Sequence, residues 1–153
     1  MLGSNAMWRI IIEQDRSDSL VKRQELLSVR VFPIWDVCHA NGFVALGYDD
    51  PKSPGHGQIG RMSKVGPGDY VVIQLKGKGI VAIAQATKSY QKVVDDVFLK
   101  GSPGLMSHRV SVEWLRVFSP QNLKKTSMLS HYRDAFLQLK APQDRTVVKA
   151  WLK

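Results

Sequence analysis

The most regular hydrophobic pattern in this chain lies between residues 62 and 86, MSKVGPGDYVVIQLKGKGIVAIAQA. Two short apolar runs, residues 70–73 and 80–83, flank the glycine-containing turn 76–79. β-Branched residues favour strands and glycine permits the positive φ angles of a tight turn, so the segment predicts a β-hairpin. Both runs are apolar at consecutive positions, which predicts a hairpin buried on both faces, as in a small barrel or covered sheet.

Apolar runs predict two further strands, at residues 8–13 and 43–48, and the alternation of Val110, Val112 and Trp114 predicts a third at 108–118. Helices are expected at residues 19–29, capped by Asp18 or Ser19, and at 33–40, where proline occupies the first turn. Residues 49–60 and 89–104 have the composition of irregular surface connections.

Residues after 118 are expected to be helical. Apolar residues recur there at helical spacing, namely Met128, Tyr132, Ala135, Phe136 and Leu139. Pro142 interrupts this pattern before a last helix around residues 147–151. Taken together, these strands and helices are assigned to an α+β fold.

Length and composition favour one domain. The chain has 153 residues, of which 44% are hydrophobic and 23% charged, typical values for a globular domain. Residues 1–6 are interpreted as a cloning remnant, so the domain is expected to span residues 7–153. No apolar run reaches the length of a membrane span, and no signal peptide precedes the first strand.

The titratable side chains argue against catalysis and against metal binding. The one cysteine, Cys38, fits a cytoplasmic protein, and the four histidines have no metal-ligand spacing. Cys38 and His39 are adjacent in a predicted helix, where neighbouring side chains diverge and cannot form a nucleophile and base. We therefore predict no metal, no cofactor and no catalytic residue.

Net charge is the first indication of function. Twenty-two Lys and Arg residues against 13 Asp and Glu residues give a net charge of +9. Such an excess attracts polyanions and is typical of domains that bind nucleic acid, although basic proteins also occur without such a ligand.

Several motifs occur in an order typical of one superfamily. The first motif is a predicted strand that ends in Leu46-Gly47-Tyr48. The predicted hairpin follows, with Gly68-Asp69 directly before its first strand, and then His-Arg-x-x-Val-Glu-Trp-Leu at 108–115. From Met7 to about Phe118 the chain resembles the PUA-like superfamily and, within it, the EVE and YTH branch. It is most similar to the version at the N-terminus of McrB-type restriction proteins. The resemblance implies a small PUA-like β-barrel with flanking helices.

The same resemblance implies a pocket that receives one base flipped out of its strand and holds it between aromatic rings. Tyr48 matches one aromatic position of the family, with Asp49 beside it, and Tyr90 or Phe98 matches the other. The family favours tryptophan at both positions. Trp35 and Trp114, by contrast, are expected in the core because of their helical and strand spacing.

Phosphate groups are expected to contact basic side chains close to this pocket. Lys76 and Lys78 lie in the hairpin turn, where flexible cations suit a nucleic-acid backbone or simply face solvent. The same two interpretations apply to Arg61, Lys64 and Arg109. His108 is expected either beside the pocket or in a structural role.

The sequence therefore favours a recognition module that binds DNA through a modified base, in a restriction or defence context, with a restriction ATPase or nuclease as a possible partner. RNA is the alternative nucleic acid, because PUA-like domains commonly serve RNA. A small hydrolase of the ASCH type and a protein-interaction domain are the alternatives from other classes.

Overall fold

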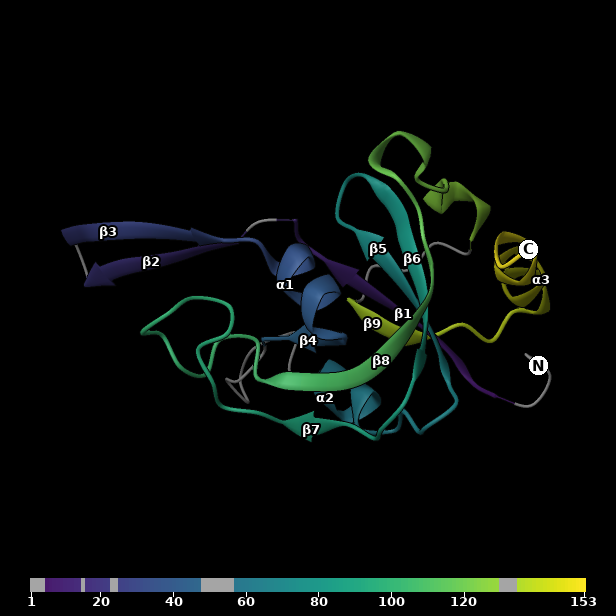
Figure 1. Cartoon of the computed structure of the whole chain (residues 1–153), viewed down its shortest axis with the longest axis horizontal. Helices are drawn as coiled ribbons and strands as arrows, with labels where there is room; N and C mark the ends of the chain where they lie inside the picture. Colours follow the sequence, from purple (N-terminus) through teal and green to yellow (C-terminus); the bar gives the residue numbers. More distant parts are fainter. Residues whose placement is uncertain (1–4, 15, 23–24, 48–56, 130–134) are drawn as a thin grey trace.

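The computed structural model of the chain describes residues 5–14, 16–22, 25–47, 57–129 and 135–153. Its sheet strands are β1 (Met7–Ile12), β4 (Phe43–Leu46), β5 (Tyr70–Leu75), β6 (Gly79–Ala86), β7 (Gln91–Lys92), β8 (His108–Val117) and β9 (Phe136–Gln138). Within the described residues they form one curved sheet in the order β4-β8-β6-β5-β1-β9, and β7 also pairs with β8 (Figure 1). Strands β1 and β5 run parallel, whereas the other pairs are antiparallel.

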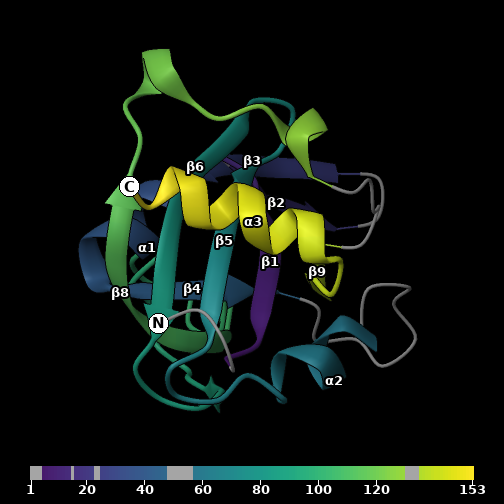
Figure 2. The same ribbon diagram turned by 90° about the vertical axis from the view of Figure 1, so that its right-hand side faces the viewer.

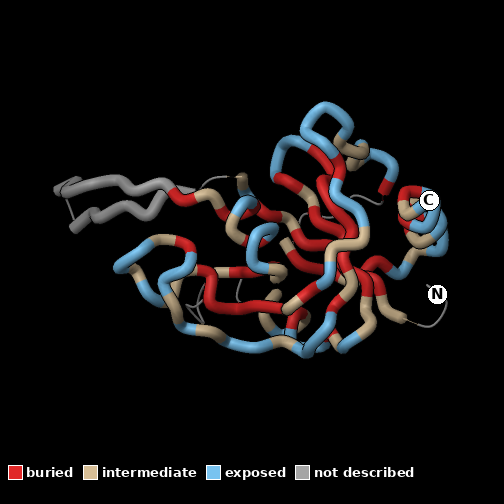
Figure 3. The backbone as a smooth tube through the Cα atoms, viewed as in Figure 1, coloured by how far each residue is buried: buried red, intermediate tan, exposed pale blue. Residues whose placement is uncertain are grey.

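Both faces of the sheet are covered. Val71 and Ile73 of β5 join one buried cluster, which includes residues of helix α1 (Ile34–Asn41). Tyr70 and Val72 face the opposite side and join a second cluster with residues of helix α3 (Pro142–Trp151). Figure 2 shows α3 lying across β5 and β6, and Figure 3 shows the buried residues gathered along the strands. This double burial explains the consecutive apolar positions of the hairpin.

The predicted central hairpin is confirmed. β5 and β6 pair from Tyr70↔Gln85 to Leu75↔Gly79, and the turn contains Gly77 at a φ angle of +72°. Helix α1 and strands β1, β4 and β8 also lie where the sequence predicts them, within a few residues at each end.

The predicted helix at residues 19–29 is wrong. Strands β2 (Arg16–Lys22) and β3 (Glu25–Phe32) form a separate antiparallel hairpin instead, paired from Arg16↔Phe32 to Lys22↔Glu25. It extends away from the sheet (Figure 1). The apolar spacing in this stretch fits either structure, and hydrogen bonding between the two halves of the segment decides between them.

The predicted helix around Phe136 and Leu139 is also wrong in its described part. Residues 136–138 form β9, which pairs with the edge of β1, and Phe136 stacks on Trp8 with ring centroids 5.4 Å apart. Tyr132 lies outside the described residues. The last predicted helix is confirmed as α3, with Pro142 as its first residue.

The two predicted connections contain little regular structure. Helix α2 (Gly57–Met62) occupies the end of the first, and the rest of the predicted loop 49–60 lies outside the described residues. The connection after β6 contains only the two-residue strand β7 before β8 begins. The η1 (Pro120–Asn122) and η2 (Thr126–Met128) turns lead from β8 toward β9. In the described part of the chain, no helix is long and apolar enough to cross a membrane.

Candidate nucleic-acid interface

Tyr90 and His108 form a fixed aromatic pair where three strands meet. His108 begins β8 and pairs with Leu46 of β4 on one side and with Lys92 of β7 on the other. The Tyr90 ring stacks on the imidazole with centroids 5.9 Å apart and planes inclined by 13°. The Tyr90 hydroxyl also lies 2.6 Å from His108 Nδ1, within hydrogen-bond distance. Because His108 is buried and Tyr90 is only half-buried, the imidazole holds one face of a partly accessible ring.

The predicted residues Tyr48 and Asp49 lie outside the described residues. Strand β4 ends at Leu46, opposite His108. The prediction that Tyr48 and Tyr90 share a pocket stays a prediction.

Phe98 is buried in the core. It is 4% exposed, and its ring makes edge contacts with Phe32 at 6.1 Å and with Phe43 at 5.7 Å. An aromatic ring enclosed in this way fixes its loop and offers no open face to a base. The described geometry therefore favours Tyr90 over Phe98 as the second aromatic side chain.

Arg109 is held within the protein. Its guanidinium donates to both carboxylate oxygens of Asp95, at 2.6 and 2.7 Å, and its Nε donates to the Met106 carbonyl. The guanidinium also lies 4.6 Å from the centre of the Phe43 ring. With Arg109 only 5% exposed, these contacts favour a structural role over the predicted phosphate contact.

The Arg109–Asp95 ion pair connects the 93–107 segment to β8. Hydrogen bonding from the guanidinium lowers the pKa of Asp95 below its ordinary value of 3.8. The Asp95 side chain is 40% exposed, so water reaches one side of this carboxylate. The pair is a means of fixing the segment that follows Tyr90 and contains Phe98.

The other predicted phosphate ligands lie in different places. Lys76 and Lys78 are exposed in the β5–β6 turn, and Lys76 Nζ is 3.8 Å from a carboxylate oxygen of Glu13. Arg61 of α2 donates to the Phe136 carbonyl at 3.1 Å, which joins α2 to β9. Lys64 is exposed after α2. The structure thus divides the predicted cations between the hairpin turn and the α2 region.

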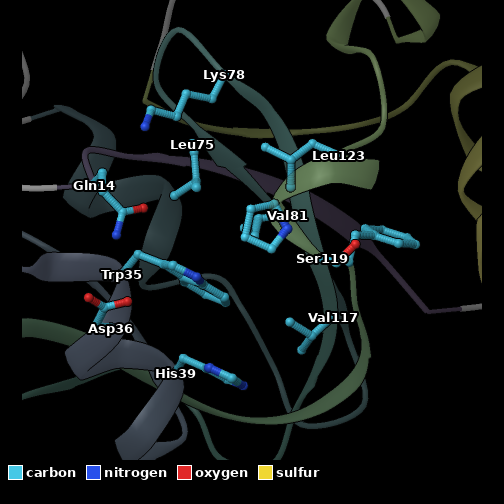
Figure 4. Close-up of a pocket in the computed structure, with 12 residues that line it drawn as sticks. Gln14, Trp35, Asp36, His39, Leu75, Lys78, Val81, Val117, Ser119 and Leu123 are labelled. Atoms are coloured by element: carbon cyan, nitrogen blue, oxygen red, sulfur yellow. The ribbon is translucent and has the colours of Figure 1, made fainter.

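A cavity of about 480 Å³ lies beside the hairpin turn, between α1 and the end of β8 (Figure 4). Trp35, Asp36 and His39 of α1 form one wall. Leu75, Lys78 and Val81 of the hairpin form another, and Val117 with the turn after it completes the enclosure.

Sequence reasoning missed this cavity because it assigned Trp35 to the core. Trp35 is indeed only 6% exposed, yet it also lines the cavity. His39 stacks on the Trp35 indole at 5.2 Å with planes 4° apart, and Trp114 contacts both rings through edge interactions. The i, i+4 spacing of Trp35 and His39 in a predicted helix is the signal that could have indicated a shared aromatic surface.

Two observations on the described residues concern the Cys38 thiol and metal binding. Burial raises the pKa of the Cys38 thiol from 9.0 to about 12, so this cysteine is a poor nucleophile at neutral pH. No group of three or more His, Cys, Asp or Glu side chains among the described residues is arranged to hold a metal ion.

Comparison with known proteins identifies the fold. No protein-family model and no curated protein sequence matches the chain. Among solved structures, one match is the YTH domain of Zygosaccharomyces rouxii MRB1 in complex with N6-methyladenosine RNA. Its TM-score is 0.56 at 14% sequence identity, and the match covers 99% of this chain and 90% of that one. The YTH domain-containing protein Mmi1, in complex with RNA, matches with a TM-score of 0.55 and 11% identity over 95% and 80% of the two chains.

A third similar structure is human THYN1 in complex with DNA containing 5-methylcytosine, with a TM-score of 0.49, 12% identity and coverage of 97% and 98%. The YTH matches confirm the α+β fold expected from the sequence, a small, barrel-like sheet with flanking helices.

Proposed function

We propose that this chain is a nucleic-acid recognition module that holds one extruded, modified base between Tyr48 and Tyr90. The observation that carries the proposal is the half-buried Tyr90 ring, fixed by its stack and hydrogen bond to His108 beside the last residue of β4. A ring held in this way is ready to stack on a planar ligand without first losing conformational freedom.

The energetics of base extrusion are consistent with two aromatic contacts. Removing a base from its stack costs a few kcal/mol. Stacking on an aromatic side chain contributes about 1–3 kcal/mol per contact, so two rings together offset that cost. The net charge of +9 adds a sequence-independent attraction to phosphates, for which the exposed Lys64, Lys76 and Lys78 are available.

The proposal retains DNA in a restriction or defence context as the first candidate, in keeping with the resemblance to McrB-type domains. A restriction ATPase or nuclease on another chain would then supply the chemical activity. RNA is the second candidate, favoured by the fold shared with a YTH domain bound to N6-methyladenosine RNA. In both cases the chain acts as a reader rather than as an enzyme.

Binding of matched oligonucleotides tests the proposal. DNA and RNA strands, unmodified or carrying N6-methyladenine or 5-methylcytosine, are titrated with wild type, Tyr90→Ala, Tyr90→Phe and Tyr48→Ala. Tyr90→Ala is expected to weaken binding of the preferred modified strand about 5- to 150-fold, because it removes one stacking ring. Tyr90→Phe keeps the ring and is the matched control.

The pattern of results separates the alternatives. Loss of affinity in Tyr48→Ala and Tyr90→Ala, confined to one modified base, supports the reader function. Salt-sensitive binding that depends neither on the modification nor on either tyrosine would refute the base pocket. It would show non-specific binding of phosphates to a basic surface. Turnover of nucleosides or small amides without binding to any oligonucleotide would instead favour the ASCH-type hydrolase.

A further inference from the structure

We propose that the chain forms a two-fold dimer in which β3 (Glu25–Phe32) pairs antiparallel with β3 of a second copy, centred on Val29. Strand β3 belongs to the hairpin that extends away from the main sheet (Figure 1). Among the strands that the structure describes, β3 pairs only with β2 (Arg16–Lys22), and β2 pairs only with β3. Each copy would contribute its hairpin to one four-stranded antiparallel sheet at the dimer interface.

The hairpin is anchored at its base. Phe32, the last residue of β3, is 2% exposed, and its ring meets the buried Phe98 ring at 6.1 Å in an edge contact. Beyond this base the two strands have only each other as partners in the described part of the chain. A two-stranded sheet is at best marginally stable in water, and three or more strands are needed for independent stability. A second hairpin supplies the missing strands.

The two outer edges of the hairpin differ in how well they suit the addition of a strand. Natural edge strands discourage pairing with another chain through charged residues, proline or bulges. Strand β2 has three charged residues among its seven, Arg16, Asp18 and Lys22. Residues 26–32 of β3, LLSVRVF, contain one charged residue, Arg30, and no proline. The edge of β3 is therefore the less protected of the two.

The pairing inside the hairpin defines which residues of β3 share a face. The register is continuous over residues 28–32 of β3, and its one irregularity lies nearer the tip. Successive residues of a strand alternate between its two faces. Val29 and Val31 are therefore assigned to one face, and Ser28 and Arg30 to the other. Any strand that pairs with β3 must respect this alternation.

Charge selects one register of β3 against its own copy. A two-fold axis through Val29 places this residue opposite Val29 of the partner subunit, and it places Arg30 opposite the partner's Ser28. An axis through Arg30 would place two arginines opposite each other, and like charges in that position are destabilising. An axis through Ser28 would place Arg30 opposite the partner's Leu26, which offers it no polar group. Only the register centred on Val29 pairs apolar with apolar and polar with polar residues.

The dimer is expected to be weak because its strands are short. Pairing about Val29 joins residues 27–31 of the two copies. So few residues bury less than the roughly 1,200 Å² that marks the lower limit of standard protein interfaces. We therefore expect a dissociation constant of about 1–100 µM.

The first test measures association of the full chain by sedimentation between about 1 µM and 1 mM. Val29→Lys places two ammonium groups opposite each other at the two-fold axis. Ser19→Lys is the matched control, because Ser19 of β2 pairs with Val29 and adds the same charge to the same face. Its two copies would lie three strand spacings apart, about 14 Å, which exceeds the Debye length of about 8 Å at physiological ionic strength.

We expect wild type to associate with increasing concentration, and Val29→Lys to raise the dissociation constant about tenfold or more. Ser19→Lys is expected to change it less than about threefold. A wild-type chain that stays monomeric up to about 1 mM overturns the proposal. Equal effects of the two lysine variants overturn it as well.

The second test is disulfide cross-linking, which does not depend on weakening the hairpin. Residues directly opposite in an antiparallel pair have Cα atoms about 4.5–5.5 Å apart, within the roughly 4.4–6.8 Å that a disulfide spans. Val29→Cys is therefore expected to cross-link the two copies under mild oxidation, whereas Ser19→Cys is not. The native Cys38 is buried and does not interfere.

A third cysteine variant tests the other edge of the hairpin. Pairing through β2 would be centred on Leu20, a register that places Asp18 opposite the partner's Lys22. Cross-linking of Leu20→Cys without cross-linking of Val29→Cys would assign the dimer to β2 and overturn the proposal. Equal cross-linking of Val29→Cys and Ser19→Cys would indicate random collision and overturn it too. No nucleic acid enters these tests, so the dimer and the base reader can fail independently.

Discussion

Removing the charge of Asp95 should loosen the segment that follows Tyr90. Asp95 lies in the connection between β7 and β8, and it accepts two hydrogen bonds from the buried Arg109 guanidinium. Asp95→Asn keeps the shape of the side chain but replaces one acceptor oxygen by an amide donor that faces the guanidinium. The variant therefore leaves a buried charge with one good acceptor in place of two.

The expected loss of stability is about 2 kcal/mol. Breaking a fully buried ion pair by removing one partner costs about 3–5 kcal/mol. Asp95 is 40% exposed, so water solvates part of the change and reduces that figure. Charge-assisted hydrogen bonds contribute about 1.5–3 kcal/mol, which brackets the same value. For a chain of this length, a 2 kcal/mol loss lowers the unfolding midpoint by about 4–8 °C.

Urea denaturation of Asp95→Asn and Asp96→Asn measures the effect. Asp96→Asn makes the same charge change one residue later, where the carboxylate is exposed and accepts a hydrogen bond from the Gly101 backbone N–H. We expect it to cost less than about 1 kcal/mol. Combining Asp95→Asn with Arg109→Met should give a loss smaller than the sum of the single losses. Equal destabilisation by the two Asn variants, or strict additivity in the double variant, would refute the reasoning.

Three further outcomes follow from the same structure. The pKa of Asp95 is lowered on folding, so the carboxylate stabilises the fold above its ordinary pKa of 3.8. This stabilisation is lost as the pH falls through the lower pKa of the folded state. Urea titrations should therefore show wild type losing more stability than Asp95→Asn between about pH 5 and pH 2. Gly79→Ala would place a Cβ 2.8 Å from the Lys124 carbonyl oxygen at a φ of +147°, and should lower the free energy of unfolding by about 2–4 kcal/mol. Gly77→Ala, where the space around the new Cβ is open, should lower it by about 1–2 kcal/mol. Thermal unfolding of the two variants measures the difference. Cys38, with a pKa of about 12, should react with a thiol reagent at pH 8 only after denaturant is added, and rapid labelling of the folded chain would contradict its burial.

The parts of the fold that sequence reasoning predicted correctly are those whose pattern is local. The β5–β6 hairpin has both strands and its glycine-containing turn within one short segment. Helix α1 begins directly after Pro33 and ends at Asn41, before Gly42, which has a φ of +70°. Strand β8 shows the alternation that predicted it, with Val110 and Val112 buried. In each case the signal and the structure lie in the same stretch of chain.

The wrong predictions concern strands whose existence depends on distant partners. Residues 19–29 contain good helix formers with apolar residues at helical spacing, yet the segment pairs with itself as β2 and β3. Strand β9 has only three residues and exists because β1 offers an unpaired edge. Periodicity cannot detect a strand of that length, and no local feature of residues 136–138 identifies β1 as their partner.

The positions of the candidate site residues also depend on long-range structure that the sequence pattern does not show, and strand β8 is the element that separates them. The sequence grouped Tyr90, Arg109, Lys76 and Lys78 around one pocket, but a strand of ten residues can separate its two ends by about 30 Å. His108 and Arg109 begin that strand beside Tyr90, whereas its last residue, Val117, lines the cavity near Lys78. Residues brought together by a family motif can therefore belong to two sites joined by one strand. A ligand that contacts both Tyr90 and Lys78 must therefore extend along β8.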